Sequence, residues 1–179
     1  MVAAVVLAAG ASTRFGAPKQ RLLLDEVVGR VCAAPSVEDV VVVLGAHDVA
    51  TETDARAVRC PDWERGPGAS LRCGLAALPA EAEAAIVALA DGPDLAPEGV
   101  ERLVAAWRGG AGTLLAASYG GVRGHPFLLA RSAWGDVPDE GMRARKSVLV
   151  PCDDLGAPGD VDRPEDLPQR FRNRDSEPR

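Results

Sequence analysis

The residues best suited to chemistry lie in the loop from Leu7 to Lys19, in which small residues are followed by Arg14 and then by Lys19. Small residues let a ligand approach the backbone, and successive N–H groups of such a loop can bind an anion. The two cationic side chains add fixed positive charge. Binding of a triphosphate requires both backbone N–H groups and positive charge, so the loop predicts a nucleotide site. The alternative is a flexible surface loop that carries two solvated cations.

Two common nucleotide motifs are absent from this loop. A Walker A sequence ends in Gly-Lys-Ser/Thr, four residues after a first glycine, and a dinucleotide fingerprint reads Gly-x-Gly-x-x-Gly. Neither pattern occurs between residues 7 and 19. The loop therefore excludes a P-loop site and an ordinary dinucleotide-binding site.

The elements that must position this loop follow from the apolar pattern. Apolar runs over residues 2–7, 40–44 and 85–90 each end at turn-forming residues, as is typical of strands buried on both faces. Residues 70–78 and 97–107 have apolar side chains at helical spacing and predict helices. This alternation favours an α/β fold with a mostly parallel sheet, covered by helices on both faces. Ligands of such sheets bind beyond the carboxyl ends of the strands.

The second half of the chain departs from this alternation. Residues 113–118 and 127–129 predict a hairpin, so we expect the sheet to be mixed near this edge. From Pro168 onward the chain is charged and has only Phe171 as a large apolar residue. We therefore expect a disordered tail over residues 168–179.

Composition limits the class of protein. With 179 residues, the chain is close to the prior of about 150 residues per domain, and we expect one domain over residues 1–167. The net charge of −6 and the lack of a basic block argue against nucleic acid as a partner. The apolar N-terminus has no cationic region before it and stops at Gly10, so it predicts neither a signal peptide nor a membrane span. The cytoplasm is the expected location.

The cysteines carry no metal signature, because they form no Cys-x-x-Cys pair and have no zinc-knuckle spacing. We expect all of them to be buried or incidental thiols: Cys32, Cys60, Cys73 and Cys152.

Five motifs follow one another along the chain: Leu7 to Lys19, Trp63 to Leu75, Asp91-Gly92-Pro93, Gly124-His125-Pro126 and Asp160 to Leu167. In this order they resemble the motifs of MobA- and MocA-like nucleotidyltransferases of the molybdenum cofactor cytidylyltransferase type. The first matches the family's Leu-Ala-Ala-Gly-x-Ser-x-Arg-Phe/Met-Gly-x-x-Lys. The resemblance implies a three-layer α/β/α, Rossmann-like fold of the nucleotide-diphospho-sugar transferase (GT-A-like) kind.

The resemblance also implies a reaction. A nucleotidyl group would pass from an NTP, with CTP favoured, to a phosphorylated acceptor, with molybdopterin or the molybdenum cofactor favoured, and pyrophosphate would leave. Mg²⁺ is the implied cofactor, with Asp91 and Asp162 as its ligands. Asp160 competes with Asp162 for the second position. Structural alternatives exist for both ligands, since Asp91 can begin a turn and Asp162 can cap a helix that starts at Pro164.

The same resemblance implies roles for other residues. The catalytic set is Arg14, Lys19 and Asp91. The expected nucleotide contacts are Leu7, Ala8, Ala9, Gly10, Ser12, Arg14, Lys19 and Ser70, although Ser12 and Ser70 can equally bond to local backbone. The expected acceptor contacts are Gly124, His125, Pro126 and Arg143, and the segment from Asp139 to Arg143 would help to shape their pocket. We assign His125 no acid or base role, and His47 no functional role.

A second hypothesis keeps the fold and changes the class of function. The protein would bind a nucleotide or the molybdenum cofactor as a maturation chaperone, or serve another redox-cofactor role, without transferring anything. Retention of the cations and carboxylates together argues against this, since a pure binder has no need of metal ligands. Under the transferase hypothesis, a molybdoenzyme that receives the product is an expected partner.

Overall fold

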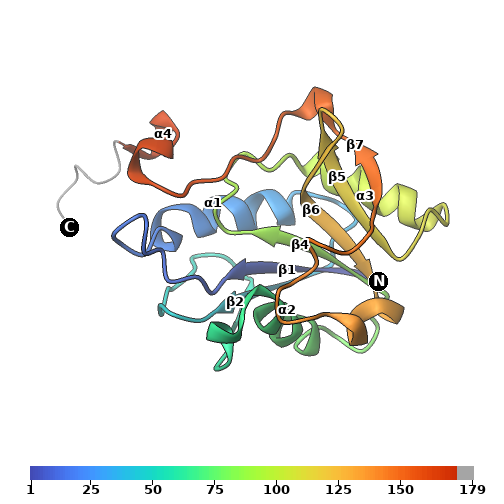
Figure 1. Cartoon of the computed structure of the whole chain (residues 1–179), viewed down its shortest axis with the longest axis horizontal. Helices are drawn as coiled ribbons and strands as arrows, with labels where there is room; N and C mark the ends of the chain where they lie inside the picture. Colours follow the sequence, from blue (N-terminus) through green and yellow to red (C-terminus); the bar gives the residue numbers. More distant parts are fainter. Residues whose placement is uncertain (173–179) are drawn as a thin grey trace.

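The computed structural model describes residues 1–172, with a seven-stranded sheet at the centre (Figure 1). In spatial order the strands are β3 (Arg56–Arg59), β2 (Asp39–Leu44), β1 (Val2–Ala8), β4 (Ala84–Leu89), β6 (Val122–Ala130), β5 (Leu114–Tyr119) and β7 (Val148–Pro151). Neighbours pair in parallel except at β6, which is antiparallel to both β4 and β5. The predicted mostly parallel, mixed sheet and its hairpin are therefore confirmed.

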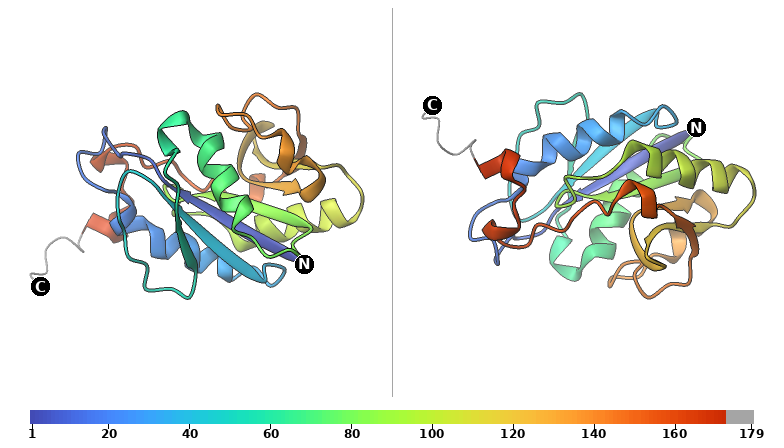
Figure 2. Two further views of the ribbon diagram at one scale, coloured as in Figure 1. Left: turned by 90° about the horizontal axis from the view of Figure 1, so that it is seen from below. Right: turned by 90° about the horizontal axis from the view of Figure 1, so that it is seen from above.

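Helices cover both faces of the sheet (Figure 2). α1 (Gln20–Cys32) and α3 (Pro97–Arg108) pack on one face, and α2 (Pro67–Ala76) packs on the other. The predicted helices are thus confirmed, although α2 begins earlier than expected. Short 3₁₀ helices are η1 (Trp63–Arg65), η2 (Arg131–Asp136), η3 (Asp153–Leu155) and η4 (Pro164–Asp166). Within residues 1–172, no helix has the length and apolarity needed to cross a membrane.

The sequence of β1 is apolar at every position, without the alternation of a half-exposed strand. Ala4 and Val6 belong to the core layer under α1 and α3, whereas Ala3 and Val5 belong to the layer under α2. Both faces of a central parallel strand are buried, so every position must be apolar. On the α2 side, a Cβ atom at Gly74 would lie 2.4 Å from Cγ1 of Val5. Only glycine therefore allows α2 to approach β1 this closely.

The structure corrects one expectation about the cysteines. Cys60, just after β3, and Cys73, in α2, form a disulfide rather than two incidental thiols. Cys32 is an exposed free thiol and Cys152 a buried one. The bond ties the edge of the sheet to the helix that covers it. Because the two cysteines are 13 residues apart and match no motif, the sequence offers no signal for the pairing.

The expectation of a disordered tail is wrong for residues 168–172. The short helix α4 (Gln169–Arg172) carries Phe171, which is 1% exposed and packs with Leu23, Val161 and Leu167. This one aromatic ring buries enough apolar surface to anchor an otherwise polar segment. Residues 173–179, the rest of the expected tail, lie outside the described residues.

The disulfide gives the first testable prediction. Alkylation of the unreduced, denatured protein should label two thiols, and alkylation after reduction should label four. Replacing Cys60 and Cys73 by serine together should lower the free energy of unfolding by about 3 kcal/mol in chemical denaturation, because the cross-link restricts a short loop of the unfolded chain. Cys32→Ser is the matched control and should leave stability unchanged. Labelling of four thiols without reduction would contradict the bond.

Candidate active site

Three segments meet at the edge of the sheet where β1 and β4 end. The loop after β1 leads through Arg14 to Lys19, the residue that precedes α1. Asp91 follows β4, and Asp162 belongs to the segment that leads into η4. The carboxyl ends of parallel strands open onto such an edge, because the crossover helices begin there. The fold therefore brings together groups that are far apart in sequence.

Lys19 is the centre of this arrangement. Its Nζ donates to Oδ2 of Asp91 at 2.9 Å and to the backbone oxygen of Val161 at 2.6 Å, and lies 3.7 Å from Oδ1 of Asp162. Its side chain is only 13% exposed. The guanidinium of Arg14 donates to Asp162 from the solvent side. Two cations thus balance carboxylates that would otherwise repel one another.

Asp91, Asp160 and Asp162 form a carboxylate cluster, with one oxygen atom of each within 4.8 Å of the others. Burial, followed by the charges of Asp91 and Asp162, raises the pKa of Asp160. Hard divalent cations bind through carboxylate oxygens in this kind of arrangement. The chemistry of the donor set therefore fits a divalent metal ion. The sequence left Asp160 and Asp162 as competitors, and the structure brings both to Asp91.

The structural alternatives for the two aspartates find no support in the contacts. The carboxylate of Asp166, not that of Asp162, accepts the N–H groups of Asp162 and Arg163 at the start of η4. The turn after β4 is closed by the N–H of Gly92 bonding to the oxygen of Leu89. The side chain of Asp91 instead bonds to Lys19. Both carboxylates thus point to the site rather than to a local backbone role.

Sequence reasoning missed the residue that shapes the loop. Gln20 is 3% exposed, and its Nε2 donates to the oxygens of Gly10 at 2.7 Å and Ala8 at 3.3 Å. Its Oε1 accepts the hydroxyl of Ser12 at 2.9 Å, and Ser12 has a positive φ of 52°. The hydroxyl of Ser12 therefore serves the shape of the loop. A glutamine beside Lys19 carries no sequence signal for this role.

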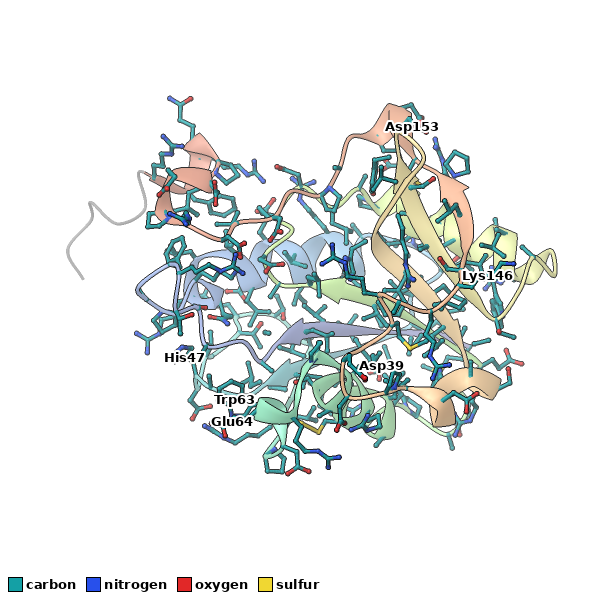
Figure 3. All side chains as sticks on the ribbon, viewed as in Figure 1. Asp39, His47, Trp63, Glu64, Lys146 and Asp153 are labelled. Carbon is teal, nitrogen blue, oxygen red and sulfur yellow. A yellow bond between two sulfur atoms is a disulfide. The ribbon has the colours of Figure 1, made fainter. Side chains whose placement is uncertain are left out.

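His47, to which the sequence analysis assigns no functional role, also supports the loop. Its Nε2 lies 2.9 Å from the backbone oxygen of Ala11, and the ring comes from the chain that follows β2 (Figure 3). Next to it, the N–H of Ala46 donates to the oxygen of Ala9 at 3.0 Å. A Cβ atom at Gly45 would lie 2.6 Å from that same oxygen, so the two segments are in close contact.

The loop after β1 and two aspartates of the cluster, Asp91 and Asp162, line a cavity of about 290 Å³. Most of the predicted nucleotide contacts line it, namely Leu7, Ala8, Gly10, Ser12, Arg14 and Lys19, together with Asp91 and Asp162. Ala9 and Ser70 do not. Ala9 is buried with its oxygen bonded to Ala46, and Ser70 is buried in α2. The structure thus brings together all the predicted nucleotide residues except these two.

A second cavity, of about 800 Å³, adjoins the first, since Leu7 and Asp91 line both. Its walls include three predicted acceptor contacts: Gly124, His125 and Arg143. Pro126 does not line it. Proline lacks an N–H group, and the pairing of β6 with β4 stops at Phe127. Pro126 thus lies next to the last residue of β6 that pairs with β4, whereas Val122 and Arg123 still pair with β5.

His125 is held in its neutral form. Burial lowers its pKa to about 4, and the nearby charge of Asp91 only partly opposes this shift. A neutral imidazole offers a hydrogen bond and a flat apolar surface, but no positive charge. This electrostatic setting agrees with a contact role for His125.

Comparison with protein families identifies the chain. The model of the MobA-like NTP transferase domain matches residues 4–153. The chain belongs to the MobA-like NTP transferase family. Membership supports nucleotidyl transfer as its general activity. No curated protein sequence matches the chain significantly.

Solved structures of similar proteins agree with the MobA-like fold. An Rv0371c homologue from Mycobacterium sp. strain JC1 is 27% identical, with a TM-score of 0.75 over 92% of each chain. A manganese complex of Rv0371c from Mycobacterium tuberculosis H37Rv is 25% identical, with a TM-score of 0.68 over 98% of this chain and 99% of the other. A molybdopterin-guanine dinucleotide biosynthesis protein A from Archaeoglobus fulgidus is 17% identical, with a TM-score of 0.66 over 99% and 100%. At that identity it supports the fold alone.

The carboxylate cluster gives a prediction about metal. Titration with Mn²⁺, followed by electron paramagnetic resonance of the free ion, should show binding to the wild-type MobA-like domain. Asp91→Asn and Asp162→Asn should each weaken it by about tenfold or more, because an anionic ligand is lost. Asp48→Asn, an exposed position outside the cluster, is the control. Equal affinity in all four proteins would exclude the cluster as the metal site.

The buried glutamine gives a prediction about stability. Gln20→Leu keeps the volume of the side chain but leaves two backbone oxygens and a hydroxyl without their partner. The free energy of unfolding should fall by about 1–3 kcal/mol. Chemical denaturation measures this, with the exposed Gln169→Leu as the control. A loss equal to that of the control would show that the loop keeps its shape without Gln20.

Proposed function

We propose that this protein transfers the cytidylyl group of CTP to molybdopterin or the molybdenum cofactor and releases pyrophosphate. The observation that carries the proposal is the meeting of two cavities at Asp91, one lined by cations and loop backbone, the other larger and partly apolar. Two substrates can therefore meet beside a cluster of carboxylates. The reaction joins two anions, so positioning and neutralisation of charge are its main requirements.

The first cavity suits the triphosphate. The ammonium group of Lys19 lies at its wall, held there by Asp91 and the backbone of Val161, and Arg14 covers the solvent side. Phosphate oxygens entering the cavity would meet both cations. Their positive charge would stabilise the leaving pyrophosphate, on which negative charge develops.

A divalent ion, proposed as Mg²⁺, would be held by the carboxylate cluster of Asp91, Asp160 and Asp162. When bound, it would supply positive charge next to the reacting phosphates. The likeness to the manganese complex of Rv0371c supports a divalent metal in general. The choice of Mg²⁺ rests on the chemistry of NTPs, which carry this ion in solution.

The second cavity suits an acceptor with a flat, weakly polar body and an anionic end. Leu71, Phe127, Met142 and the neutral ring of His125 form apolar wall, while Arg143 supplies a cation. Molybdopterin combines a ring system with a terminal phosphate. An oxygen of that phosphate would attack the α-phosphorus of CTP, and the bond from that phosphorus to the bridging oxygen would break. Pyrophosphate leaves with the bonding electrons.

Preference for CTP rests on the sequence Leu7-Ala8-Ala9-Gly10, which resembles that of cytidylyltransferases. The proposal extends to a molybdoenzyme that receives the product and to action in the cytoplasm. A chaperone that only binds the cofactor is the competing proposal, and the assay below separates the two.

The test is pyrophosphate release with molybdopterin, Mg²⁺ and each of CTP, GTP, ATP and UTP. We expect turnover with CTP above the others. Lys19→Ala should lower kcat/KM by about 100-fold or more, because a cation facing the leaving group is lost. Lys146→Ala, an exposed residue outside both cavities, is the matched control (Figure 3). A thermal shift with molybdopterin but no turnover with any NTP would favour the chaperone.

A further inference from the structure

One wall of the larger cavity is a segment without helix or strand. Glu140, Gly141, Met142 and Arg143 line the cavity between η2 and β7. Such a segment has no ladder of its own to hold it in place, so its position depends on contacts with neighbouring elements. The segment from Val137 to Arg143 is called the wall segment below.

Backbone contacts dock the wall segment on the start of α2. The N–H of Gly68 donates to the oxygen of Asp139 at 2.9 Å. A Cβ atom at Gly68 would lie 1.6 Å from the oxygen of Pro138, and one at Gly66, where φ is +130°, would lie 2.4 Å from the oxygen of Asp139. Any side chain at these two positions would push the segments apart. The docking therefore requires both glycines.

Side chains then lock the docked segment. The carboxylate of Asp139 accepts a hydrogen bond from Nη2 of Arg65 at 3.0 Å and another from Nη2 of Arg72. Arg72 also donates through Nη1 to the oxygen of Val137 at 2.7 Å. The two guanidinium groups hold the pKa of Asp139 below its usual range. Arg72 thus binds both the backbone and the side chain of the wall segment.

The glycines and arginines that hold the first half of the wall segment, from Val137 to Asp139, all lie between Cys60 and Cys73. At the other end of the segment, Arg123 of β6 donates to the oxygen of Arg143 at 3.2 Å. Arg65 belongs to η1, next to Trp63 and Glu64 (Figure 3), whereas Arg72 lies in α2. The disulfide closes this stretch into a loop and fixes its two ends to each other. The wall segment is therefore docked on a stretch of chain whose two ends are joined by a disulfide.

We infer that Asp139, gripped by Arg65 and Arg72, positions the wall segment and thereby sets the affinity for the acceptor. Asp139 lines neither cavity, so it acts through Glu140 to Arg143 as a positioning residue rather than as a catalytic one. The nucleotide cavity lies on the other side of Asp91 and contains no wall-segment residue. Affinity for the NTP should therefore not depend on the hydrogen bonds of Asp139 with Arg65 and Arg72. The inference rests on the proposed function, because it concerns the acceptor of that reaction.

An isolated surface ion pair would not position a segment in this way, since most such pairs contribute little to the stability of the fold. The chain offers a matched example. Arg102 donates twice to Asp154, at 2.6 Å in both bonds, and this pair lines neither cavity. Breaking it removes a similar ion pair without touching the wall segment. Asp154→Asn is therefore the control for Asp139→Asn.

The experiment measures steady-state kinetics of pyrophosphate release from CTP, with molybdopterin varied at saturating CTP and the reverse. Asp139→Asn should raise the KM for molybdopterin by about tenfold, through misplacement of the wall segment. The KM for CTP and the kcat at saturating molybdopterin should stay within about twofold of wild type. Arg72→Ala should act like Asp139→Asn, and Asp154→Asn should act like wild type.

Other results would overturn the inference. An unchanged KM for molybdopterin in Asp139→Asn removes the link to the acceptor, and a parallel rise of both KM values indicates a general structural defect. If the wild type transfers nothing, the proposed function fails, and the Kd for molybdopterin, measured by protein fluorescence, replaces KM. A tenfold higher Kd in Asp139→Asn then still supports the positioning role. An unchanged Kd, or no binding by the wild type, overturns it.

Discussion

Repulsion between like charges is the constraint on which the site depends. Three carboxylates converge to within 4.8 Å at the edge of the sheet, and ionised groups this close destabilise one another unless cations balance them. Lys19 supplies that balance from the end of the β1 loop, and Arg14 adds a second cation from outside. The loop must therefore fold back over the cluster, and Gln20 and His47 hold the backbone that makes this possible. The shape of the β1 loop and the charge balance of the carboxylate cluster therefore depend on each other.

The sequence predicts the parts of the molecule in which local pattern and burial coincide. β1 and β4 are apolar runs because both of their faces are covered, and the loop after β1 has a recognisable order of small and cationic residues. α1 likewise has apolar residues at helical spacing, at Leu24, Val27, Val28 and Val31, because this face packs on the sheet. The edge strands β3 and β7 are short and largely exposed. β3 has no apolar run, and the apolar run of β7 is only three residues long, from Val148 to Val150.

What the sequence does not predict is pairing across long separations. Gln20 reads as an ordinary polar residue at the start of a helix, and only the folded loop turns it into a buried donor. Cys60 and Cys73 have a spacing that fits no motif. Asp139 and Arg72 are 67 residues apart, and their contact depends on the position of α2 on the sheet. Motif resemblance locates the segments of the site, whereas tertiary packing decides which of their atoms meet.

Among the strands of residues 1–172, only β6 runs opposite to the others, and its direction affects the shape of the larger cavity. β6 enters the sheet from the edge where β1 and β4 end, so its first residues, from Val122 to His125, project past the last pair that it forms with β4. Val122, at the turn from β5, is 70% exposed on this overhang. Lengthening or shortening the hairpin would change the depth of the larger cavity without altering β1 or the loop that follows it. One fold can thus keep the cavity beside β1 unchanged and alter the larger cavity by varying one overhanging hairpin.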